Sequence, residues 1–78
     1  MREKQLRLIL TFSTTTAAMS MEQACRTAGA PGRLIPVPRE ITAGCGMAWS
    51  APPETRKLLA QVAREAGISF SGVYELMI

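Results

Sequence analysis

The residues best suited to chemistry in this 78-residue chain are its two cysteines, Cys25 and Cys45. The sequence contains no His, Asp or Asn, which excludes a Ser-His-Asp triad, a Cys-His pair and a histidine-ligated zinc site. A thiol is then the only strong nucleophile that the composition offers. Any covalent chemistry of this chain is therefore expected at a cysteine.

Cys45 lies between two glycines, Gly44 and Gly46, in a segment with loop signals. Glycine on both sides removes side-chain bulk and permits backbone angles closed to other residues, so a partner could approach the sulfur closely. Arg33 and Arg39 precede this motif, and a hairpin-like return of the chain could bring a guanidinium near the thiol and favour the thiolate. We therefore take Cys45 as the candidate catalytic residue, with candidate binding residues Arg33, Arg39, Gly44 and Gly46.

Each cysteine also has a purely structural interpretation. The Gly-Cys-Gly motif is compatible with a tight turn in which Cys45 is only a small residue that fits. Cys25 falls beside Ala24 in a predicted helix, where a free cysteine behaves as a small hydrophobe. The two lack the C-x-x-C spacing of a redox pair or a metal loop, and the sequence leaves a disulfide between them open. The sequence predicts neither a metal site nor a cofactor.

The elements that must position Cys45 follow from the periodicity of apolar residues. Leu6 to Phe12 alternates with the period of a half-buried strand. Ser13 and Thr14 then offer hydroxyls as N-caps, and small apolar residues recur at helical spacing from Ala17 to a stop signal at Gly29. Gly32 to Val37 is a short extended run, and its prolines predict a position at the edge of a sheet.

The second half of the chain repeats this pattern of extended and helical segments. Gly46 to Ala51 can form a strand, with Met47 and Trp49 on one face. Pro52 and Pro53 open a second helix, which Gly67 closes in the manner of a Schellman cap. Phe70 to Ile78 is rich in β-formers, and Gly72 is the expected position of a bulge.

The order strand, helix, strand, strand, helix, strand predicts an α+β fold: a ferredoxin-like βαββαβ two-layer sandwich with two helices on one face of an antiparallel four-stranded sheet. Right-handed crossovers place the first and third strands in the centre. The other sheet face is left for water, a ligand or a second subunit, and we expect Trp49 and Tyr74 to mark it. The length predicts one domain, residues 1–78, and the small size favours a homodimer.

The net charge of +3 is spread along the chain and does not form a basic run, so nucleic acid is not an expected partner. Arg2 and Lys4 precede an apolar stretch, but Arg7 interrupts it and polar residues follow it, so a strand is favoured over a signal peptide. No segment approaches the roughly 20 apolar residues that cross a bilayer. We therefore expect a cytoplasmic protein without a membrane partner.

Three blocks of sequence carry a resemblance to a known family: Thr14 to Glu22, Pro31 to Ile41 and Gly44 to Ala48. From Leu8 to Leu76 the chain resembles a small bacterial family of selenium/sulfur carrier protein-like domains, which have about this length. The family's cysteine falls on Cys45. The resemblance therefore implies that the thiol of Cys45 handles sulfur or selenium.

In the carrier mechanism that the resemblance implies, the thiolate of Cys45 takes a terminal sulfur or selenium from a donor persulfide or perselenide and yields it to an acceptor. The donor would be a protein such as a cysteine desulfurase and the acceptor an enzyme, so a carrier is favoured over a stand-alone enzyme. Arg33 and Arg39 would stabilise the anionic sulfur, while Gly44 and Gly46 would keep the site open. The alternative is a noncatalytic anion- or protein-binding module in which Cys45 is structural.

Overall fold

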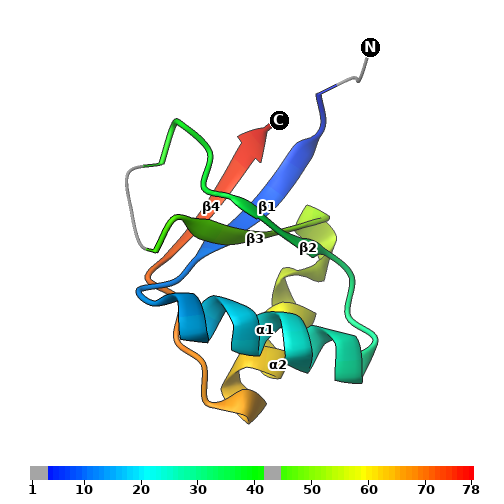
Figure 1. Cartoon of the computed structure of the whole chain (residues 1–78). Coiled ribbons are helices and arrows are strands. Elements are labelled where there is room, and N and C mark those ends of the chain that lie inside the picture. Colours follow the sequence, from blue (N-terminus) through cyan, green and yellow to red (C-terminus); the bar gives the residue numbers. More distant parts are fainter. Residues whose placement is uncertain (1–3, 42–44) are drawn as a thin grey trace.

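The computed structural model describes residues 4–41 and 45–78, and its sheet has the strand order β2-β3-β1-β4 (Figure 1). The elements are β1 (Leu6–Thr11), α1 (Thr15–Ala28), β2 (Arg33–Pro36), β3 (Met47–Ala51), the 3-10 turn η1 (Pro53–Thr55), α2 (Arg56–Ala66) and β4 (Gly72–Met77). All paired strands are antiparallel. This is the predicted ferredoxin-like arrangement, with the first and third strands in the centre.

The N-terminal cap of α1 and the C-terminal cap of α2 lie where the sequence predicts them. The hydroxyl of Thr14 accepts a hydrogen bond from a backbone N–H of the first turn of α1 at 3.0 Å. Gly67 adopts the left-handed conformation after α2, and the N–H of Ile68 donates to the carbonyl oxygen of Ala63 at 2.8 Å, which is a Schellman cap. Within the described ranges, neither helix has the length and apolar character that crossing a bilayer requires.

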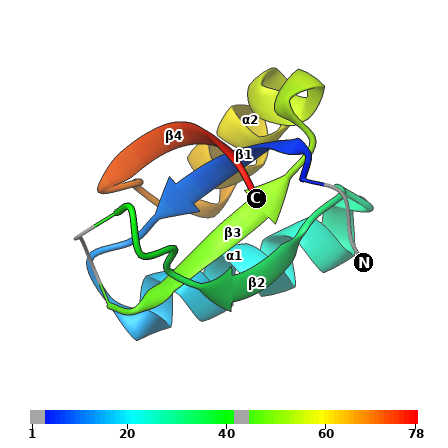
Figure 2. The same ribbon diagram turned by 90° about the horizontal axis from the view of Figure 1, so that it is seen from above.

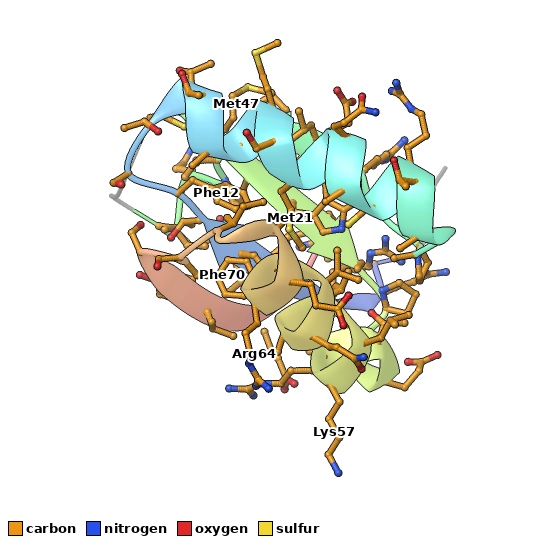
Figure 3. All side chains as sticks on the ribbon, turned by 90° about the horizontal axis from the view of Figure 1, so that it is seen from below. Phe12, Met21, Met47, Lys57, Arg64 and Phe70 are labelled. Carbon is orange, nitrogen blue, oxygen red and sulfur yellow. The ribbon has the colours of Figure 1, made fainter. Side chains whose placement is uncertain are left out.

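The main apolar core lies between the two helices and one face of the sheet (Figure 3). Its buried members are Leu8, Leu10, Phe12, Ala18, Met21, Cys25, Trp49, Ala51, Leu59, Val62 and Ala63. The ring of Phe12 meets that of Phe70 edge to face, with centroids 5.8 Å apart. These contacts join the end of β1 to the chain that follows α2, so the core holds both halves of the repeat together.

The opposite face of the sheet carries a second, smaller cluster. Ile9 and Ala48 are fully buried there because Ile41, from the connection after β2, packs over them. Figure 2 shows that connection running across one end of the strands, with the helices behind the sheet. This face is therefore covered in part within one chain.

Two details, at Trp49 and Gly72, differ from the sequence prediction, and the expectation for Tyr74 is confirmed. Trp49 does not mark the open face: it belongs to the core on the helix side, where its Nε1 donates to the carbonyl oxygen of Pro31 at 3.3 Å. Tyr74 pairs with Ile9 and does lie on the open face. Gly72 forms no bulge, since it pairs with Thr11 in an unbroken register. The glycine instead makes room for the ring of Tyr74, because a Cβ at this position would lie 2.6 Å from that ring.

Gly32 lies directly before β2 and allows the backbone conformation with which the chain enters this strand. Its φ of 121° disfavours other residues, and a Cβ there would lie 2.7 Å from the carbonyl oxygen of Ser50 and against the indole of Trp49. We predict that Gly32→Ala lowers the free energy of unfolding by about 2 kcal/mol or more. Gly29→Ala is the matched control, since Gly29 also has positive φ but open space, and should cost about 1 kcal/mol. Equal losses in urea unfolding would contradict the packing argument.

Candidate functional site

Cys45 lies just before β3, where the chain passes the end of β1. Its backbone N–H donates to the carbonyl oxygen of Phe12 at 3.1 Å. On the other side, the N–H of Val37 donates to the carbonyl oxygen of Gly46 at 3.0 Å, which closes the connection between β2 and β3. Backbone hydrogen bonds to two different segments therefore fix the position of the thiol.

Cys45 is half-buried and packs against the edge of the core. Its side chain packs on the helix side of the sheet, and its Sγ lies 3.8 Å from the carbonyl oxygen of Met47, a weak S–H hydrogen bond. Gly46 is exposed, and nothing lies within 4 Å of a Cβ built on it. Gly44 lies outside the described residues. The described residue that follows Cys45 therefore adds no side-chain bulk to the site, and a side chain there would meet open space.

The structure does not place Arg33 beside Cys45. The paired residues of β2 and β3 run from Arg33 and Ser50 at one end to Pro36 and Met47 at the other. Cys45 lies beyond the second end. The three steps along β2 from Arg33 to Pro36 span about 10 Å. Neighbouring Leu34 packs into the core on the helix side, so Arg33 lies on the opposite sheet face from the thiol. The hairpin-like return expected from the sequence therefore occurs, but it does not pair this arginine with the cysteine.

Arg39 lies closer to the thiol along the chain path. It is exposed on a turn in which the N–H of Ile41 donates to the carbonyl oxygen of Pro38 at 2.9 Å. Val37 is hydrogen-bonded to Gly46, the residue after Cys45. Arg39 lies two residues after Val37, so it is close in sequence to the point where the chain meets the cysteine segment. Among residues 4–41 and 45–78, no hydrogen bond or ion pair joins either arginine to Cys45.

Cys25 is a different kind of thiol. It is 1% exposed in the core under α1, and burial raises its pKa because an apolar surrounding disfavours the thiolate. This confirms the interpretation of Cys25 as a small hydrophobe. Both cysteines are free thiols in the structure, so they are not joined in a disulfide. Cys45 is therefore the accessible sulfur of the two.

The part of the chain that the structure describes contains no group of three His, Cys, Asp or Glu side chains able to hold a metal ion. A hollow of about 900 Å³ lies on the sheet face away from the helices, and Cys45 does not line it. Arg33 lines it together with Arg7 and Lys4, two cations that the sequence did not single out. Only the strand register brings these three residues together, so no local motif could have identified them.

A family model described as "Putative Se/S carrier protein-like" matches residues 7–75 of the chain. The match spans nearly all of the sequence, including every element of the sheet and both helices. It also agrees with the resemblance carried by the segments around Arg33 to Glu40 and Gly44 to Ala48. Comparison with curated proteins and with solved structures gave no match.

The contrast between the two thiols predicts selective modification. With a disulfide reagent such as 5,5′-dithiobis(2-nitrobenzoate) under native conditions, one thiol per chain should react at least about tenfold faster than the other, because burial hinders both access to Cys25 and formation of its thiolate. The Cys45→Ser variant should lose the fast phase and Cys25→Ser should keep it. A fast phase that survives in Cys45→Ser would show that the assignment of accessible and buried thiols is wrong.

The raised pKa of Cys25 predicts a loss of stability at alkaline pH. Below the pKa of the unfolded chain, about 8.5, both states hold the thiol proton and pH has no effect through this group. Above it the unfolded chain releases the proton while the folded chain keeps it, so unfolding is favoured by up to about 1.4 kcal/mol per pH unit. Between about pH 8 and pH 10, the unfolding free energy of wild type should fall more steeply than that of Cys25→Ala. Parallel curves would contradict this.

Proposed function

Because the chain belongs to the Se/S carrier protein-like family, we propose that Cys45 is the carrier residue, which accepts a sulfur or selenium atom from a donor protein and passes it to an acceptor. The observation that carries the proposal is the half-buried thiol of Cys45, held by backbone hydrogen bonds beside free space at Gly46. Its fixed backbone and open side suit a thiol that must meet the active sites of two partners in turn.

The transfer is a thiol exchange without net oxidation. The thiolate of Cys45 attacks the terminal sulfur of a donor persulfide; a bond forms between Sγ and that sulfur, and the bond to the donor's own sulfur breaks. The donor thiolate leaves with the electron pair, and Cys45 becomes the persulfide. An acceptor nucleophile then attacks the terminal sulfur, and Cys45 returns to the thiolate. Selenium follows the same steps through a perselenide.

The local geometry supports this chemistry in two ways. The added atom lies about 2 Å beyond Sγ, and Gly46, which follows Cys45, is exposed and carries no side chain that would compete with it. The weak hydrogen bond to the carbonyl oxygen of Met47 is readily given up when the thiol loses its proton. The groups that accept and donate protons during the exchange then come from the partner proteins, since the chain has no His and no Asp of its own.

Within this proposal Arg39 is the arginine that assists the sulfur. It is exposed on the turn that follows Val37, whose N–H donates to the carbonyl oxygen of Gly46 beside Cys45, whereas Arg33 is on the other face. A guanidinium in the same loop offers a mobile positive charge to the anionic persulfide or to an acidic residue of a partner. Arg39 therefore acts on the loading step and does not contribute to the fold.

We predict that incubation of the full chain with a cysteine desulfurase and cysteine, or with selenocysteine as the alternative substrate, adds the mass of one sulfur or selenium atom to Cys45. The intact mass, followed by peptide mapping, measures the adduct. Reductant should remove it, because a persulfide is a thiol-exchangeable adduct. Comparing the two substrates distinguishes sulfur from selenium as the cargo.

The matched controls use the second cysteine and the arginines. Cys25→Ser should load like wild type, Cys45→Ser should not load, and Arg39→Gln should load several-fold more slowly than Arg64→Gln, which changes an exposed arginine on α2. Loading of Cys45→Ser would refute the site. Equal rates for the two arginine variants would remove Arg39 from the mechanism and leave Cys45 in place.

A further inference from the structure

The open face of the sheet holds a hollow of about 900 Å³, a volume within the range of small-molecule sites. The residues that line it are Lys4, Gln5, Arg7, Arg33, Ile35, Pro36, Pro38, Ser50 and Ile78. They come from the start of β1, the end of β3, β2 with the residues after it, and the C-terminal residue. We call this hollow the basic groove.

Arg7 and Arg33 flank one serine, Ser50, in the floor of the basic groove. Arg33 on β2 pairs directly with Ser50 on β3, so their Cβ atoms lie about 5 Å apart on the same face. From the other side, Nε of Arg7 on β1 donates to Oγ of Ser50 at 3.1 Å, which directs this side chain across β3 toward β2. The hydrogen bond holds the half-buried Arg7 in place and leaves its two terminal amino groups available.

The side-chain charges in the basic groove are of one sign. Lys4, Arg7 and Arg33 contribute three cations, and no Asp or Glu side chain lines the hollow among the described residues. The ion pair between Arg26 and Glu22 lies along α1 and does not neutralise these groups. A concave surface lined by one sign of charge raises the local concentration of the opposite ion. An anionic group placed between the two guanidinium groups would relieve their repulsion.

The remaining lining is apolar. Ile35, Pro36, Pro38 and Ile78 line the basic groove together with the cations, and Gln5 adds one amide. A small inorganic anion would leave most of a 900 Å³ hollow unfilled. The ligand that fits both parts therefore carries its negative group on an apolar body, which displaces water from the isoleucine and proline side chains.

We propose that the basic groove binds an organic anion, a phosphate or carboxylate group on an apolar body, with the anionic group held between Arg7 and Arg33. Guanidinium groups bind both anions through paired hydrogen bonds, so the two sources share one recognition chemistry. The site is independent of the thiol, because Cys45 does not line it and packs on the other side of the sheet. A variant that abolishes loading of Cys45 therefore leaves this binding unchanged.

The test titrates the full chain with phenyl phosphate and benzoate, which present the two anions on the same ring, and with inorganic phosphate and phenol, which present each half alone. Isothermal titration calorimetry gives the affinity and amide chemical shifts give the location. At least one aromatic anion should bind about tenfold more tightly than inorganic phosphate and phenol, with shifts at Arg7, Ser50 and Ile78. Raising the salt concentration should weaken this binding.

Arg33→Gln is the decisive variant, since Arg33 is exposed and its loss does not disturb the core. It should weaken binding of the tighter aromatic anion about tenfold. The control Arg64→Gln removes the same charge from α2, where the side chain points away from the body of the protein (Figure 3), and should bind like wild type. Unchanged affinity in Arg33→Gln, shifts confined to other surfaces, or no saturable binding of any probe would overturn the proposal. Tighter binding of an acidic peptide than of either aromatic anion would also overturn it, in favour of protein docking.

Discussion

The burial of β1 on both faces is the constraint from which the rest of this small structure follows. Residues from Leu8 to Phe12 are at most 1% exposed, so the strand needs cover above and below the sheet. The two helices cover one face, but Ile9 points to the other. Burying a side chain of this size stabilises a fold by roughly 1.5–3 kcal/mol, a large fraction of what a 78-residue domain has. The connection after β2 meets this requirement by placing Ile41 over Ile9.

That one contact shapes both surfaces to which we assign functions. Drawing Ile41 onto the open face turns the chain at Pro38, and the bond between Val37 and Gly46 closes the connection beside β3. The closure fixes Cys45 at the end of β1, on the helix side. The same turn places Pro38 in the lining of the basic groove, on the opposite face of the sheet. The thiol and the groove are therefore two consequences of how the sheet is covered.

The fold could be predicted from the sequence because its signals are local. Alternation in Leu6 to Phe12, the cap at Thr14, the stop at Gly67 and the prolines of β2 each act over a few residues, and together they determine the strand and helix order. The predictions that were wrong concern which face of the sheet a side chain occupies and which neighbour a glycine accommodates. Alternation correctly grouped Met47 with Trp49, but it cannot say which face a group occupies; packing of the indole against Pro31 and Gly32 decides that. The bulge expected at Gly72 is absent because this glycine makes room for the side chain of Tyr74 and does not change the backbone register.

The candidate site shows the same division between local and long-range information. Cys45 could be identified from composition and its glycine neighbours, whereas the role expected for Arg33 depended on a register that the sequence does not specify. A ten-residue connection separates β2 from β3, and pairing across it sets Arg33 opposite Ser50, five residues beyond the thiol. The modest net charge of +3, scattered along the chain, likewise gives no sign of an anion site. Yet antiparallel pairing of β1 and β2 with the same strand, β3, gathers residues 4, 7 and 33 around one hollow. Local charge density in so small a protein is a property of strand register, and composition alone underestimates it.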